Sequence, residues 1–266
     1  MIASIVKVLV AVAVALPLVM YFLQDRLIFH PQPVDDALRA QIAATFPAAK
    51  EVFLKSDDGV RLHAWQLGSG SDLVLYFGGN AEEVSGRLGE VEAGLPGAAW
   101  LLTDYRGYGA SPGSPSETKL VADALRWYDH AARELKPARV FAFGRSLGSG
   151  VAVALASQRR LAGIILVTPY DSLLAVAQRH YPWLPVRWLL KHRFDSIALA
   201  PGLEVPMLCL IAGDDELIPP AHAERLYEAW GGSKRKLVLA GAPHGDPDSA
   251  PGFWPAIRRF VSEGNG

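Results

Sequence analysis

The sequence has little that would support a disulfide-stapled, metal-binding or nucleic-acid-binding protein. Its 266 residues include one cysteine, Cys209, which excludes an internal disulfide framework and a metal site with several cysteine ligands. The 26 basic and 27 acidic residues give a net charge of -1, so no nucleic-acid-binding surface is expected. Because half of the residues are apolar and only 20% are charged, the chain is predicted to fold around a large core.

The longest apolar run stands at the amino terminus. Between Ile2 and Leu23 the only charged residue is Lys7. A helix of about 20 residues is about 30 Å long, which matches the hydrocarbon core of a membrane. We therefore expect residues 1–26 to form a membrane anchor with one transmembrane helix at about 4–23.

Cleavage and orientation of this segment leave alternatives open. Ala11, Ala13 and Ala15 could form a signal-peptidase site, but the apolar run continues beyond them, which favours an uncleaved anchor. A buried helix of a soluble protein is the third interpretation. The charges that flank the run differ little, and the orientation adopted here places the large domain on the non-cytoplasmic side.

From residue 27 onward, short apolar runs alternate with helix-length amphipathic segments. This alternation is typical of an α/β domain with a mostly parallel central sheet and flanking helices. The first two runs are separated by Asp57, Asp58 and Gly59, which predicts an antiparallel hairpin. No repeat or linker divides the rest, so one domain is expected over residues 27–266. The predicted strands are 51–55, 61–67, 72–77, 99–104, 140–144, 163–168, 207–212 and 236–240, and the predicted helices are 81–94, 117–135, 147–157, 221–230 and 253–262.

A serine stands between the fifth predicted strand and the helix that follows it. In the sequence GRSLG of residues 144–148, glycines lie two positions before and after Ser146. This spacing is typical of a nucleophile elbow, a tight strand-to-helix turn in which larger side chains would clash at the glycine positions. A serine that only caps a glycine-rich helix start is the alternative. The pattern predicts Ser146 as a nucleophile and leaves Arg145 as a structural ion-pair partner.

A serine nucleophile needs a base that takes its proton and a carboxylate that orients the base. Asp215 follows the seventh predicted strand and His244 follows the eighth, so both are expected at the edge of the sheet that holds Ser146. We predict His244 as the base and Asp215 as the acid. His222 is an alternative base, and Asp171, after the sixth strand, is an alternative acid.

Acyl transfer also needs backbone N–H groups that stabilise the negatively charged oxygen of the tetrahedral intermediate. The amide of Leu147, directly after the nucleophile, is the first predicted donor. The second is expected from the loop 78–81 after the third strand, and the amide of Asn80 is our choice. A loop that only caps the next helix is compatible with this role, because a helix start presents free amides.

These motifs resemble the α/β-hydrolase superfamily over nearly the whole chain. Within it, the sequence is similar to small membrane-anchored members, which include bacterial serine aminopeptidase-like hydrolases and eukaryotic α/β-hydrolase-domain proteins, some of them protein depalmitoylases. The resemblance implies an α/β-hydrolase fold and a serine hydrolase that needs no metal or organic cofactor. It favours Asp215 as the acid and assigns residues 104–109 to the scaffold. Gly78 and Gly79 depart from the histidine and glycine that commonly precede the asparagine in relatives.

Residues 171–204 stand where this fold inserts its cap. About 34 residues suffice for a short helical flap but not for a lid domain. Trp183 and Trp188 lie in this segment, and we expect them to line the substrate pocket; simple packing on the sheet is the alternative. An aromatic pocket would suit a small-molecule or lipid-like acyl ester.

The expected reaction is hydrolysis of a carboxylic ester through an acyl-enzyme. Thioesters, lysophospholipids and amides are alternative substrates, because the same three groups serve every acyl transfer. A catalytically inactive, membrane-tethered binding scaffold is the alternative outside enzymes. Dehalogenase and epoxide hydrolase chemistry is disfavoured, because those relatives carry an aspartate where this chain has Ser146.

Overall fold

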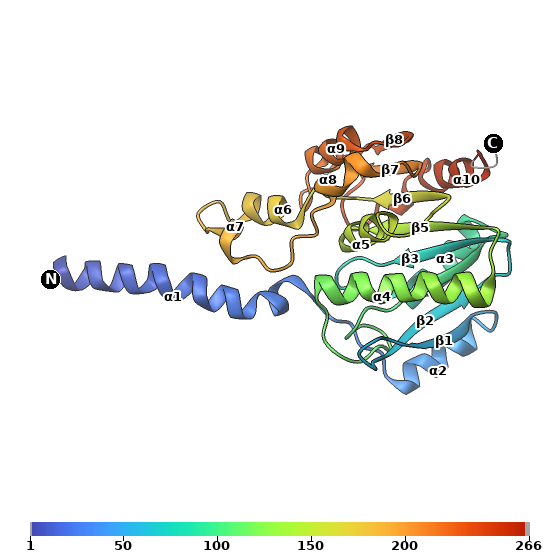
Figure 1. Cartoon of the computed structure of the whole chain (residues 1–266), viewed down its shortest axis with the longest axis horizontal. Coiled ribbons are helices and arrows are strands. Elements are labelled where there is room, and N and C mark those ends of the chain that lie inside the picture. The colour runs from blue at the N-terminus through green and yellow to red at the C-terminus, as the bar shows by residue number, and fades with distance from the viewer. Residues whose placement is uncertain (1, 264–266) are drawn as a thin grey trace.

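The predicted mostly parallel sheet is present, with helices on both of its faces (Figure 1). The computed structural model describes residues 2–263, apart from the side chains at positions 3, 6, 8–10 and 12–14. In that part of the chain, eight strands pair in the order β1-β2-β4-β3-β5-β6-β7-β8. Strand β2 is antiparallel to both of its neighbours, and the other pairs are parallel. The strands are Lys50–Lys55 (β1), Arg61–Leu67 (β2), Asp72–Phe77 (β3), Ala99–Thr103 (β4), Arg139–Arg145 (β5), Gly163–Val167 (β6), Met207–Ala212 (β7) and Lys234–Leu239 (β8).

Helices connect the strands and also precede the first of them. The segment α4 continues into a π-helical turn, and short 3-10 turns stand beside α3, α8 and α10. The helical elements are Ile2–Ile28 (α1), Asp36–Thr45 (α2), Val84–Arg87 (η1), Leu88–Gly94 (α3), Glu117–His130 (α4), Ala131–Leu135 (η2), Leu147–Ala156 (α5), Leu173–His180 (α6), Val186–Leu189 (α7), Ser196–Leu199 (α8), Ala200–Gly202 (η3), Pro220–Ala229 (α9), Pro247–Ser249 (η4) and Phe253–Glu263 (α10).

Alternate residues of the sheet fill two hydrophobic cores, because successive side chains of a strand point to opposite faces. In β3, Leu73 and Leu75 pack on the face covered by α4, α5 and α9. Val74 and Tyr76 pack on the opposite face, which is covered by α2, α3 and α10. The parallel strands are therefore apolar throughout, which is why their positions could be predicted from short apolar runs.

All eight predicted strands are confirmed to within two residues of their bounds, and so is the hairpin between β1 and β2. The helix predicted from residue 81 begins as a regular helix only at Leu88. The chain must first turn, with a positive φ of 57° at Ala81, and the Glu82 side chain is engaged by the backbone of that turn. Helix α2 was not predicted. Its apolar pattern is weak, because Ile42 is its one buried residue, so its sequence does not show the repeated apolar positions that predict a helix.

Helix α1 covers the predicted anchor and continues to Ile28. Within the described part of the chain, no helix combines the length and the apolarity that a membrane crossing requires, so the transmembrane helix predicted at about 4–23 is not supported. Side chains 6, 8–10 and 12–14 of that prediction lie outside the described ones.

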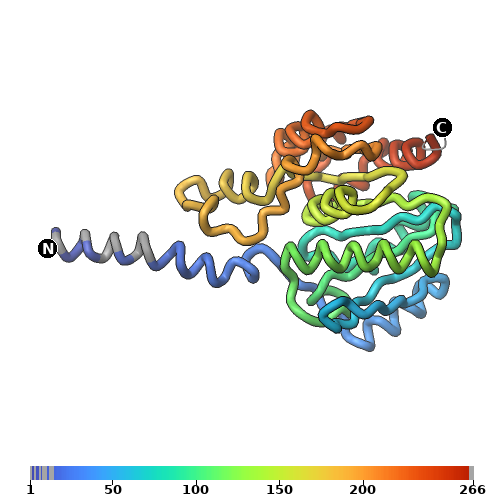
Figure 2. The backbone as a smooth tube through the Cα atoms, in the orientation of Figure 1, coloured from blue at the N-terminus to red at the C-terminus, as the bar shows by residue number. Residues whose placement is uncertain are grey.

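The cap predicted at residues 171–204 consists of α6, α7, α8, the 3-10 turn η3 and the loops that connect them. Figure 2 shows α1, α6 and α7 extending on the same side of the sheet. Helix α1 is in contact with the cap, because the Gln24 side chain donates a hydrogen bond to the carbonyl of Leu189 at the end of α7. The cap therefore lies against the last turns of the amino-terminal helix.

Candidate active site

Ser146 lies in a tight turn between β5 and α5. Its backbone has φ 49° and ψ -115°, a strained conformation for a residue with a side chain. A Cβ added at Gly144 would lie 2.4 Å from the carbonyl oxygen of Gly148, and one added at Gly148 would lie 2.0 Å from that of Phe77. Neither position can hold a larger residue without displacing backbone. The turn thus has the geometry predicted from the GRSLG sequence.

The structure brings Ser146, His244 and Asp215 into one line of hydrogen bonds. His244 Nε2 lies 2.9 Å from Ser146 Oγ, and His244 Nδ1 lies 2.6 Å from Asp215 Oδ2. The second carboxylate oxygen of Asp215 accepts the amide of Ile218 at 2.7 Å. Asp215 is buried, with 5% of its surface exposed, so its orientation toward His244 is held by the protein rather than by solvent.

The two alternative residues, Asp171 and His222, pair with each other. His222 Nδ1 lies 2.7 Å from Asp171 Oδ1, and Arg225 Nε donates to Asp171 Oδ2 at 2.7 Å. The amide of Ser172 also donates to Asp171, at the start of α6. Both carboxylate oxygens of Asp171 are therefore engaged in fixing α9 and the start of the cap, away from His244.

The loop after β3 lies against Ser146, as the predicted oxyanion site requires. A Cβ added at Gly79 would lie 3.7 Å from the Cβ of Ser146. The Gly79 amide already donates to Glu82 Oε2 at 2.9 Å, which leaves the amide of Asn80 as the next candidate donor in this loop. Leu147, the other predicted donor, is the first residue of α5, where backbone N–H groups have no partner within the helix.

The side chain of Asn80 has a role that the sequence did not indicate. Its Nδ2 donates to the carbonyl of Ile28 at the end of α1, and its Oδ1 accepts the amide of His30. The hydroxyl of Tyr108 donates to the same Oδ1 at 2.8 Å. This asparagine therefore fixes the chain that leaves α1 against the candidate oxyanion loop.

A network of charges behind the site supports the loop that carries His244. Arg145 Nη2 donates to the carbonyl of Gly245 at 2.7 Å, and Arg145 Nη1 pairs with Asp248 Oδ1 at 2.8 Å. Arg87 binds the other oxygen of Asp248 at 2.8 Å. The predicted ion-pair role of Arg145 agrees with these contacts. What sequence reasoning missed is that the pair joins the elbow to the histidine loop.

Replacing Asp248 tests this network by its dependence on pH. Burial alone would raise the pKa of Asp248, but the charges of Arg145 and Arg87 outweigh it and hold that pKa below its ordinary value. The carboxylate therefore adds stability above the unfolded pKa of about 3.9, and this contribution is lost as the pH falls through the lower folded pKa. Asp248→Asn is expected to lower the free energy of unfolding by about 2 kcal/mol at pH 7 and by much less at about pH 3, in urea titrations.

The control for this change is Asp57→Asn, since Asp57 is 77% exposed and pairs with Arg126 at the surface. That substitution should change the free energy of unfolding by no more than about 0.5 kcal/mol at either pH. An Asp248→Asn protein as stable as the wild type at pH 7 would contradict a supporting role for the network.

Two tyrosines and the single cysteine are buried, and burial raises their pKa values. Burial raises the pKa of Tyr105 and Tyr170, whose hydroxyls bond the carbonyls of Gly78 and Leu147. Burial also raises the pKa of Cys209 to about 12, so its thiol is not a nucleophile at neutral pH. Among residues 2–263, no group of three histidine, cysteine or carboxylate side chains is placed to hold a metal ion.

The two tryptophans expected in the substrate pocket lie at the surface of the cap. Trp183 is 65% exposed and Trp188 is 81% exposed, so neither lines an enclosed pocket. In the short helix α7, Val186 is buried and Leu189 is partly buried, while Trp188 lies on the outer face. The exposure of these two residues does not support their predicted place in the substrate pocket, and that role stays a prediction.

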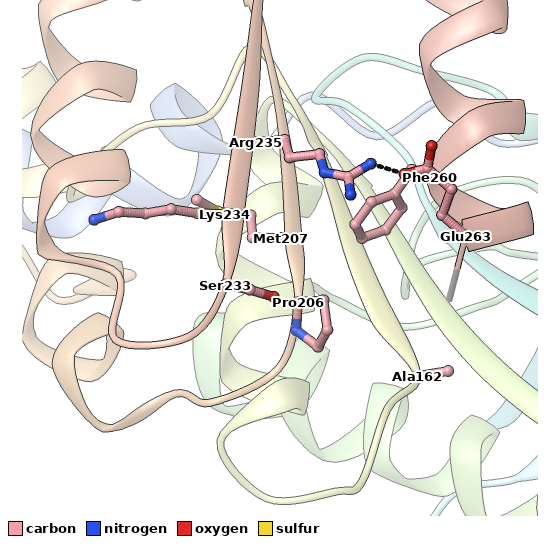
Figure 3. Close-up of a pocket in the computed structure, with 8 residues that line it drawn as sticks. All are labelled: Ala162, Pro206, Met207, Ser233, Lys234, Arg235, Phe260 and Glu263. Atoms are coloured by element: carbon pink, nitrogen blue, oxygen red, sulfur yellow. Dashed lines mark hydrogen bonds and ion pairs between the residues drawn. The ribbon is translucent and has the colours of Figure 1, made fainter. Parts of the chain in front are cut away.

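A surface cavity of about 420 Å³ lies at the opposite edge of the sheet from Ser146 (Figure 3). Pro206, Ser233 and Ala162, which line it, immediately precede β7, β8 and β6. Arg235 and Glu263 form an ion pair across it. Because the candidate catalytic side chains follow the carboxyl ends of β5, β7 and β8, this cavity is separate from their chemistry.

Comparison with known proteins agrees with the fold. A family model described as serine aminopeptidase, S33, matches residues 73–201. An uncharacterised protein of Mycobacterium tuberculosis is 40% identical over 253 residues, which cover 90% of this chain and 88% of that protein. An uncharacterised membrane protein of Saccharomyces cerevisiae is 29% identical over 226 residues, which cover 80% of each chain.

The solved structure of an esterase from Pyrococcus furiosus has a similar fold. It superposes with a TM-score of 0.67 and 18% sequence identity, over 89% of this chain and 96% of the esterase. At this level of identity the likeness concerns the fold alone. The fold and the relatives together show which kind of protein this chain is. The contacts of Ser146 are interpreted for that kind of protein.

Proposed function

Because the chain belongs to the α/β-hydrolase superfamily, in the family of serine aminopeptidase-like hydrolases, we propose that it is a serine hydrolase that cleaves carboxylic esters. The observation that carries this proposal is the line of contacts from Asp215 through His244 to Ser146, at 2.6 and 2.9 Å. The strained backbone of Ser146 supports it, because such strain is kept where a nucleophile must be presented.

In the proposed reaction, Ser146 Oγ attacks the carbonyl carbon of the ester and its proton passes to His244 Nε2. Asp215 keeps the Nδ1 proton of His244 in place and stabilises the imidazolium that forms. The amides of Leu147 and Asn80 donate to the developing oxyanion. Collapse of the tetrahedral intermediate expels the alcohol, which takes the proton from His244, and leaves an acyl group on Ser146. Water, activated by His244, then releases the acid.

The same three groups serve every acyl transfer, and an ester is our choice among the possible substrates. The name of the Pyrococcus furiosus structure, an esterase, is consistent with this choice. The buried acid and the aligned histidine also support an enzyme over an inactive binding scaffold, since a scaffold has no need of an oriented base.

A fluorophosphonate probe tests the proposal, because it reacts covalently with serines that an adjacent base activates. The full-length protein is expected to be labelled, and Ser146→Ala should abolish the labelling. Ser149→Ala is a matched control, since Ser149 lies one turn along α5 and its hydroxyl bonds a backbone carbonyl. A folded wild-type protein that is not labelled would reject the proposed function.

A separate proposal concerns location. We propose that α1 attaches the enzyme to a membrane, with the hydrolase domain on the non-cytoplasmic side. Leu18, Val19 and Phe22 of α1 are exposed, which supports contact with lipid, and the yeast relative is described as a membrane protein.

The attachment is tested by fractionation of cells that express the full-length chain. The protein is expected to stay with the membranes in high salt and to be released by detergent. External protease should reach the hydrolase domain in intact cells. Recovery of the protein in the soluble fraction would contradict the attachment, and protection from protease would contradict the orientation.

A further inference from the structure

A small apolar pocket lies between the end of α1 and the cap. Its volume is about 120 Å³. Met20, Leu27 and Ile28 line it from the amino-terminal helix, and Ala177 of α6 and Leu189 of α7 line it from the cap. The amino-terminal helix thus supplies one wall of a cavity whose other wall is the segment that α/β hydrolases place above their sheet.

Gln24 holds the two walls together. This side chain is 6% exposed, and its Nε2 donates to the carbonyls of Tyr21 and Leu189, at 2.8 and 3.0 Å. Its Oε1 accepts the amide of Lys191 at 2.7 Å. Because the polar atoms of Gln24 are engaged by backbone groups, the lining that remains is apolar and the pocket is formed in advance of any ligand.

Hydrogen bonds connect the elements that form this pocket to two loops of the candidate active site. The carbonyl of Ile28, which lines it, accepts the side-chain amide of Asn80 at 2.5 Å, next to Gly79 and Ser146. At the other side, His180 at the end of α6 lies 2.9 Å from the carbonyl of Leu217, two residues beyond Asp215. The pocket therefore lies at the same edge of the sheet as Ser146.

We propose that this pocket binds the acyl chain of the ester, so that α1 is part of the substrate site. The inference rests on the proposed serine hydrolase. An apolar cavity of about 150 Å³ accepts a benzene-sized molecule, so a cavity of about 120 Å³ suits several methylene groups. Each methylene that enters should raise kcat/KM about 4-fold until the pocket is full. Hexanoyl esters are expected to be better substrates than acetyl esters.

Filling the pocket from the cap gives the first test. Ala177→Phe places a ring in the cavity, so kcat/KM for p-nitrophenyl hexanoate should fall at least about 10-fold. The value for p-nitrophenyl acetate, whose acyl group has a single methyl beyond the carbonyl, should stay within about 2-fold. Ala175→Phe is the matched control, because Ala175 lies on the same helix but lines a different surface cavity, with His222 and Arg225. It should leave the ratio of the two esters unchanged.

Enlarging the pocket from α1 gives the second test. Met20→Ala should shift the preferred p-nitrophenyl ester from hexanoate to octanoate, with acetate turnover unchanged. If Ala177→Phe and Ala175→Phe have the same hexanoate-to-acetate ratio as the wild type, the acyl site is rejected. If Met20→Ala leaves the preferred length unchanged, the role of α1 is rejected. A wild-type protein that hydrolyses none of these esters would instead reject the hydrolase and the acyl site with it.

Discussion

Ser146→Ala is expected to lower kcat for p-nitrophenyl acetate by about 10⁶-fold, to a rate set by binding and the oxyanion donors alone. The size of the effect follows from the mechanism proposed, because without Oγ no acyl-enzyme forms and His244 has no nucleophile to activate. The measurement is initial-rate kinetics with the full-length protein, together with a thermal unfolding curve. The substitution removes one oxygen at a strained turn, so the protein should stay folded.

A smaller loss would point to a different nucleophile. If Ser146→Ala keeps more than about one hundredth of the wild-type kcat, water or another side chain must attack the ester, and the acyl-enzyme mechanism is wrong. Ser149→Ala should retain most of the activity, because its hydroxyl bonds the carbonyl of Ser146 and does not contact His244. Comparison of the two variants thus distinguishes loss of the nucleophile from a structural change in α5.

Asp215→Asn is expected to lower kcat by about 10⁴-fold with little change in KM. An amide in place of the carboxylate cannot hold the Nδ1 proton of His244 or stabilise the imidazolium. Asp171→Asn is the matched comparison, since both residues are buried aspartates that pair with a histidine after a parallel strand. It should keep kcat within about 3-fold.

Asp171→Asn should have a large effect on the stability of the protein, in contrast to its small effect on kcat. Its carboxylate is bonded by His222, Arg225 and the amide of Ser172, so Asp171→Asn should lower the free energy of unfolding by about 2–3 kcal/mol. Kinetics below the unfolding range and urea titrations measure the two effects separately. A large loss of kcat in Asp171→Asn with normal activity in Asp215→Asn would show that Asp171, and not Asp215, orients the catalytic histidine.

The sequence could predict the sheet because its parallel strands are apolar on both faces and are bounded by turn residues. Ser146 and His244 could be predicted because the glycine spacing and the chain order are specific. The choice between Asp215 and Asp171 could not be made from the residues alone, since both follow strands that end at the same edge. Only the packing of α9 and the cap, which gives Asp171 its own histidine, separates them.

The cap was predictable in length but not in orientation. Aromatic residues in a short segment indicate a hydrophobic surface, yet nothing local determines whether they point inward. The contacts between α1 and the cap turn Leu189 toward the pocket and leave Trp188 in solvent, and these contacts join residues more than 160 positions apart. Sequence patterns describe short-range periodicity, so a contact between residues this far apart could not be predicted from them.

The bond between Asn80 and the carbonyl of Ile28 bears on how this protein should be produced for study. Deleting the apolar amino terminus is the usual way to obtain a soluble fragment of such a chain, and a cut at residue 26 would look harmless in the sequence. It would remove Met20 and Gln24, open the proposed acyl pocket to water and turn the segment that Asn80 holds into a new chain end. A fragment suited to assays should therefore start ahead of Met20, with detergent or exposed-face substitutions used to keep it soluble.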